Sequence, residues 1–138
     1  MSAGPAAVLP PWKWKYEPDE NPKRRHAWGK PKPGFVKVRG SLIGKCPAGF
    51  SNEEAEKLLN NGIPYPLERW GKPWPSRIYG VHEGTVYRAT VTVGGRSYHA
   101  FPELPDRLRE LPRKFQEKLL QRAAELGCED QVRRWMNR

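Results

Sequence analysis

The chain has 138 residues and a formal net charge of +10, with 37% hydrophobic and 29% charged residues. This length suits one compact domain, and the low apolar content indicates that part of the chain lies outside its core. No apolar run approaches the roughly 20 residues that a membrane-spanning helix needs, so we expect a cytoplasmic protein with no membrane partner.

The positive charge is concentrated in the first third of the sequence. Residues 1–45 hold ten Lys/Arg against three Asp/Glu, whereas residues 46–138 hold fifteen against twelve. A cationic segment beside a nearly balanced domain is typical of proteins that bind a polyanion, although such segments also serve only to keep a protein soluble. Cys46 and Cys128 lack metal-ligand spacing, so we expect two buried thiols, no disulfide and no metal.

Residues 1–34 are predicted to form a flexible basic arm, because seven prolines interrupt both helix and sheet. Exposed aromatic rings can stack on unpaired bases while Lys and Arg contact phosphates. The arm residues that we assign to nucleic-acid binding on this basis are Trp12, Lys13, Trp14, Lys15, Arg24 and Arg25. The same proline-rich arm could instead dock onto a partner protein.

The remaining residues, 35–138, are predicted to form a single α+β domain. Apolar and basic residues alternate at the start of 35–43, which indicates a short strand and a candidate fourth strand for the main sheet. Ser51 and Glu54 match a capping box, which predicts a helix near 52–61.

A three-stranded antiparallel meander is predicted over 77–101, because Glu83-Gly84 and Gly94-Gly95 can both form tight turns. Counting outward from these turns assigns side chains to the two faces. One face is more apolar and should pack on helices. The other face is expected to be open and to bind nucleic acid, through Arg77, Tyr79, Arg88, His99 and Phe101.

Helices are predicted for the rest of the chain. Pro112 suits the first turn of a helix over 113–126, in which Phe115, Leu119 and Ala123 lie on one side. Shorter helical segments are expected after Pro105 and from residue 129 to 137.

His99 is the one candidate catalytic residue. The predicted register places it opposite Thr90 and near Arg88, and a histidine flanked by arginines has the composition of a metal-independent ribonuclease site. A histidine on a sheet also commonly packs, or contacts a ligand without catalysis. The sequence contains no P-loop, no GxGxxG and no GxSxG motif.

The sequence therefore predicts a nucleic-acid-binding protein, with RNA or single-stranded nucleic acid as the favoured partner and no cofactor. Two alternatives stay open. One is a protein-interaction module that uses the proline-rich arm, and the other is a small, toxin-like, metal-independent ribonuclease with His99 as acid and base. The sequence does not determine the oligomeric state.

Overall fold

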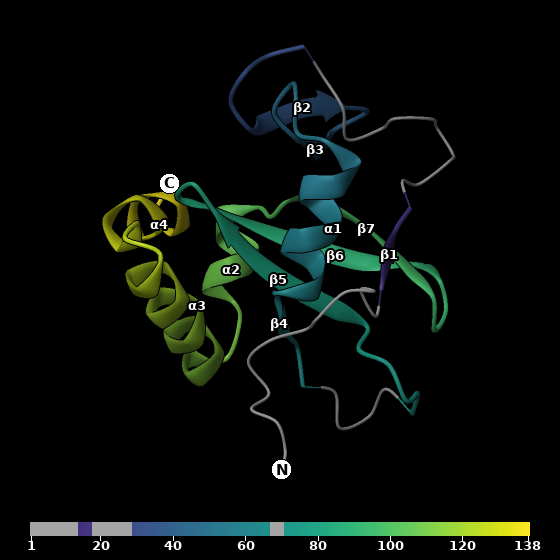
Figure 1. Cartoon of the computed structure of the whole chain (residues 1–138). Helices are drawn as coiled ribbons and strands as arrows, with labels where there is room; N and C mark the ends of the chain where they lie inside the picture. Colours follow the sequence, from purple (N-terminus) through teal and green to yellow (C-terminus); the bar gives the residue numbers. More distant parts are fainter. Residues whose placement is uncertain (1–13, 18–28, 67–70) are drawn as a thin grey trace.

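A computed structural model of the chain describes residues 14–17, 29–66 and 71–138 (Figure 1). These residues form an α+β fold with a five-stranded sheet in the order β1-β7-β6-β5-β4, a separate two-stranded sheet and four helices. The strands of the main sheet are β1 (Lys15–Tyr16), β4 (Ile63–Pro64), β5 (Arg77–His82), β6 (Thr85–Val93) and β7 (Ser97–Pro102). The other elements are β2 (Gly34–Val38), β3 (Ser41–Lys45), α1 (Asn52–Asn60), α2 (Pro105–Arg109), α3 (Arg113–Glu125) and α4 (Glu129–Met136).

The predicted meander is confirmed. Strand β6 pairs antiparallel with both neighbours, so that Arg77, Thr90 and His99 lie side by side across β5, β6 and β7. Gly84 at the first turn has a φ of +83°, a left-handed value that glycine adopts without strain. Both predicted long helices are also confirmed, and the capping box at the start of α1 is formed.

The second turn of the meander differs from the prediction. The pairing of β6 with β7 shifts between Val91 and Val93, and Val93 pairs with Ser97. Arg96 therefore lies in the turn, where its N–H donates to the Val93 carbonyl at 2.9 Å. Because the shift is confined to the end of the hairpin, Thr90 still pairs with His99.

The segment 35–43 does not add a fourth strand to the meander, so that prediction is wrong. Gly40, with a φ of +83°, reverses the chain, and β2 and β3 pair with each other as a separate hairpin. The hairpin lies across one end of the main sheet (Figure 1), where the Phe35 ring is 5.6 Å from that of Trp135. A Cβ at Gly44 would come within 2.4 Å of the Pro102 carbonyl oxygen, so only glycine permits this close approach.

Part of the predicted arm belongs to the sheet. Strand β1 runs parallel to β7, with Lys15 opposite Ser97 and Tyr16 opposite Tyr98. The sheet is therefore mixed rather than purely antiparallel. Residues 14–17 are therefore not part of a flexible arm, because their backbone completes one edge of the sheet.

Side chains of α1 hold the other edge of β1. The Trp14 N–H donates to Asn60 Oδ1 at 2.9 Å, and Asn60 Nδ2 donates to the Trp14 carbonyl at 2.8 Å. Glu56 Oε1 accepts from the Tyr16 N–H at 2.9 Å. The Trp14 ring also packs edge-on against Tyr98, with centroids 5.4 Å apart. Strand β1 is therefore fixed between α1 and β7.

Helices cover both faces of the sheet, and this overturns the expectation that one face is open along its whole length. Helix α1 lies in front of the sheet in Figure 1, where Leu59 packs on the predicted apolar face. Helices α2, α3 and α4 cover part of the opposite face, where Tyr79, Val81 and Val86 join the larger core. These three side chains are almost fully buried because the chain after Pro102 turns back over them as helices.

Replacing Asn60 by alanine should destabilise the fold. Asn60 is 5% exposed, and its loss leaves the N–H and carbonyl of Trp14 without these partners, which should lower the free energy of unfolding by about 1–3 kcal/mol. Chemical denaturation measures this change. The control is Asn61→Ala, because the exposed Asn61 side chain donates to the Lys57 carbonyl of the same helix and to no other group among the described residues. Equal stability of the two variants would contradict the role assigned to Asn60.

Candidate functional site

The part of the sheet face that the helices leave uncovered carries two cavities of about 360 and 390 Å³. Arg88, Glu103 and Arg107 line both cavities, so the two are neighbours, and we call the pair of them the arginine groove. The smaller cavity adds Tyr65, Arg77, Glu110 and Leu111. The larger cavity adds Ser41, Leu42, Ile43, Gly44, Thr90, His99, Phe101, Pro102 and Leu104.

The arginine groove brings together four of the five residues predicted for this face, namely Arg77, Arg88, His99 and Phe101. The fifth, Tyr79, is fully buried and cannot stack on a ligand. Its hydroxyl accepts from Arg77 Nη1 at 3.0 Å, and burial raises the pKa of this phenol although Arg77 opposes the shift. Tyr79 therefore supports an arginine of the groove from beneath.

Aromatic rings orient two of the guanidinium groups. The Arg77 guanidinium carbon lies 4.8 Å from the Tyr65 ring centroid, and that of Arg88 lies 4.9 Å from the Phe101 ring centroid. A guanidinium over a ring gains cation–π attraction and loses some of its side-chain freedom. The two charges are therefore positioned in the groove before any ligand binds.

Glu103 anchors Arg88 from within the protein. Glu103 is 2% exposed, and its Oε2 lies 3.3 Å from Arg88 Nη1 while its Oε1 accepts from the Leu104 N–H at 3.0 Å. Burial raises the pKa of the Glu103 carboxyl, and Arg88 is the strongest opposing influence. Glu103 is not among the residues predicted for this face, although alternation along the strand beyond His99 and Phe101 points to position 103.

Two buried polar atoms beside the groove have no hydrogen-bond partner among the described residues. They are Arg88 Nε, which can only donate, and Thr90 Oγ1, which can both donate and accept. A buried polar group without a partner costs free energy, and a ligand oxygen within reach of both atoms would recover it. The groove is therefore suited to a ligand rich in oxygen acceptors.

The hydrogen bonds of His99 fix its neutral tautomer. His99 Nδ1 lies 2.7 Å from Thr92 Oγ1, and the Thr92 hydroxyl donates to the Glu17 carbonyl at 2.7 Å. Because a carbonyl only accepts, the single hydroxyl proton is committed to Glu17, and His99 Nδ1–H must donate to Thr92. In the neutral ring the lone pair that can take up a proton is therefore on Nε2.

Only two of the arm residues predicted to bind nucleic acid, Trp14 and Lys15, are among the described residues. Trp14 is half-buried between α1 and β7, and Lys15 is exposed on β1. Trp12, Lys13, Arg24 and Arg25 lie outside the described residues. Packing against Tyr98 leaves Trp14 less surface for stacking on a base than an unstructured arm would provide.

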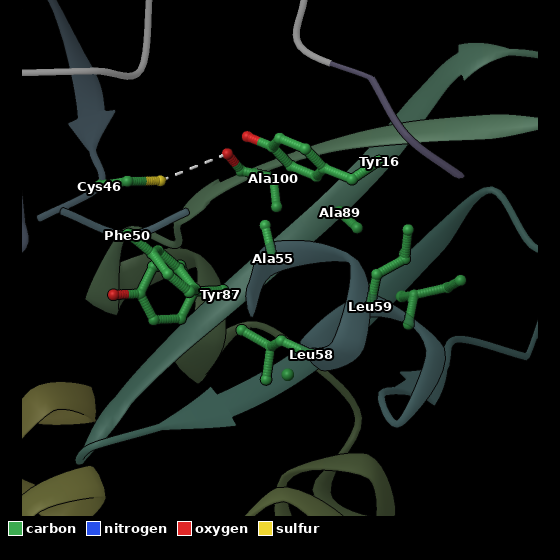
Figure 2. Close-up of a pocket in the computed structure, with 11 residues that line it drawn as sticks. Tyr16, Cys46, Phe50, Ala55, Leu58, Leu59, Tyr87, Ala89 and Ala100 are labelled. Carbon is green, nitrogen blue, oxygen red and sulfur yellow. Dashed lines mark hydrogen bonds between the residues drawn. The ribbon is translucent and has the colours of Figure 1, made fainter. Parts of the chain in front are cut away.

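A different pocket lies beneath α1 and contains the Cys46 thiol (Figure 2). The burial of this thiol argues against a catalytic role. Its lining is mostly apolar, and Figure 2 shows the Cys46 thiol directed at the Ala100 carbonyl, 3.6 Å away. Burial raises the pKa of Cys46 to about 12 and that of Tyr16 to about 12. A nucleophilic cysteine must ionise near neutral pH, so Cys46 is a packing residue.

Cys46 should accordingly resist alkylation in the folded protein. At pH 8 we expect iodoacetamide to modify Cys46 at least about 100-fold more slowly in the folded state than after unfolding in guanidinium chloride, because the raised pKa leaves little thiolate. Mass spectrometry of the peptide that contains Cys46 measures the rate. Rapid modification of the folded protein would show that this thiol is accessible and ionised.

Comparison of the chain with protein-family models, curated proteins and solved structures finds no match. Within the described residues, no helix is long and apolar enough to cross a membrane. No three His, Cys, Asp or Glu side chains gather as metal ligands in this same part of the chain. The arginine groove is therefore the feature of the described residues from which we infer a function.

Proposed function

We propose that the protein binds RNA or another single-stranded nucleic acid in the arginine groove. The observation that carries this proposal is the convergence of Arg77, Arg88 and Arg107 on this groove. Two carboxylates, Glu103 and Glu110, share the groove with them, and Glu103 is buried and paired with Arg88. The groove therefore offers more positive than negative charge to a ligand.

The chemistry of these side chains favours phosphate and base together. A guanidinium donates two parallel hydrogen bonds to phosphate oxygens, and its planar face also stacks on nucleobases. Phe101 and Tyr65 are only partly buried and place aromatic surface beside the arginines. Unpaired bases can reach such rings, whereas bases inside a duplex cannot.

The wider charge distribution supports the same partner. The net charge of +10 attracts a polyanion from a distance, and most of it is in residues 1–45. Strand β3 of the hairpin lines the groove, and the exposed Lys37 and Arg39 belong to the same hairpin. Both cysteines are free, and free thiols favour a reducing compartment, so we place the protein in the cytoplasm.

Removal of one groove charge tests the proposal. Arg107→Gln should weaken binding to a labelled, mixed-sequence single-stranded RNA and reduce the slope of log K against log salt concentration by about 1, because one phosphate contact is lost. Fluorescence anisotropy over about 50–200 mM salt measures both quantities. Arg107 is exposed, so the fold should tolerate the change.

The matched control is Arg113→Gln, which removes an exposed arginine from the start of α3, outside the groove. It changes the net charge by the same amount and should reduce binding less than Arg107→Gln does. Equal effects of the two substitutions would show that only net charge attracts RNA, and the absence of any salt-dependent binding would contradict the proposal.

A further inference from the structure

We propose that the arginine groove also cleaves the RNA that it binds, with His99 as the acid–base residue of a metal-independent transesterification. This inference rests on the proposed function and adds an activity to it. It is carried by the hydrogen bonds of His99, by Arg88, which lines the same cavity, and by the two buried polar atoms without partners among the described residues, Arg88 Nε and Thr90 Oγ1.

A catalytic base needs a fixed ring orientation and a defined tautomer, and hydrogen bonds give His99 both. Its Nδ1–H donates to Thr92, and the Thr92 hydroxyl donates in turn to the Glu17 carbonyl. Glu17 is itself fixed, because the hydroxyl of the fully buried Ser97 donates to Glu17 Oε1 at 2.6 Å. This series of hydrogen bonds orients the ring and places the basic lone pair on Nε2, as an orienting partner does for other catalytic histidines.

The residues beside His99 suit a phosphodiester that becomes more negative during reaction. Thr90 pairs directly with His99, Arg88 is two positions before Thr90 on the same strand, and all three line the larger cavity. Arg88 Nε and Thr90 Oγ1 lack hydrogen-bond partners among the described residues, so neither donor is committed to another group in this part of the protein. Donors placed before the reaction stabilise the developing charge without reorganisation.

The reaction balances with His99 alone as proton carrier. The 2′-hydroxyl oxygen of the RNA attacks the adjacent phosphorus, and its proton passes to His99 Nε2. The bond between phosphorus and the 5′-oxygen of the next nucleotide then breaks, and the imidazolium returns the proton to that oxygen. The products are a 2′,3′-cyclic phosphate and a 5′-hydroxyl end, and neither a metal nor a redox partner takes part.

Cleavage by the full-length protein in excess EDTA tests the inference. A single-stranded RNA should be cut to products with 2′,3′-cyclic phosphate ends, whereas the same sequence with 2′-deoxyribose should be bound and left intact. The rate should fall toward the acid end of a pH series from about 5 to 8, because a protonated imidazole cannot accept the 2′ proton.

His99→Ala should reduce the rate of cleavage at least about 100-fold, in line with the loss of an acid–base group. Anisotropy measures RNA binding by the same variant, and affinity should fall far less than the rate of cleavage does, because Arg77, Arg88 and Arg107 still line the groove. Unchanged cleavage by His99→Ala would overturn the assignment of the reaction to His99.

Thr92 is a positioning residue, and two variants separate this role from packing. Thr92→Val keeps the shape of the side chain but removes the oxygen that fixes His99, so kcat should fall while KM stays nearly constant. Thr92→Ser restores the hydroxyl and should recover most of kcat. Equal rates for the valine and serine variants would contradict the positioning role.

The outcomes distinguish this inference from the function on which it rests. RNA that is bound in the groove but uncut throughout the pH series overturns the catalytic inference and leaves RNA binding in place. RNA that is neither bound nor cut overturns both. Cleavage that depends on His99 and requires the 2′-hydroxyl supports both.

Discussion

The pairing of the central strand β6 with β5 and β7 is the constraint on which the rest of the structure depends. Because side chains alternate along a strand, this register decides which residues share a face and which lie opposite one another. It aligns Arg77, Thr90 and His99 across three strands, and it sets Arg88 opposite Phe101. A displacement of one residue would move these groups to the face beneath α1.

The covering helices turn that face into a groove. Helices α2 to α4 bury Tyr79, Val81 and Val86 and leave the neighbouring polar part of the same face uncovered. Glu103, which follows β7, is buried and still reaches Arg88. A buried carboxylate is favourable only beside such a partner, so the ion pair fixes where the chain leaves the sheet and enters the helices.

The N-terminal segment is coupled to the groove through its backbone. Strand β1 adds to β7, and Asn60 and Glu56 hold its other edge. The carbonyl of Glu17, directly after β1, accepts from the Thr92 hydroxyl that contacts His99. Residues 14–17 therefore support His99 as well as the edge of the sheet. They have this structural role in addition to any attraction of a polyanion by their charge.

Local signals in the sequence determined three parts of the fold, because each signal acts over a few residues. Turn glycines determined the meander, the Ser51 and Glu54 pair determined the start of α1, and the apolar spacing of Phe115, Leu119 and Ala123 determined α3. They also indicated that Arg88, His99 and Phe101 share a face. Only the tertiary structure decided that helices cover part of this face, that 35–43 forms its own hairpin, and that Glu103 and Arg107 complete the groove. These features depend on contacts between residues far apart in the sequence, and hydrophobic periodicity within one segment carries no information about which distant segment will cover it.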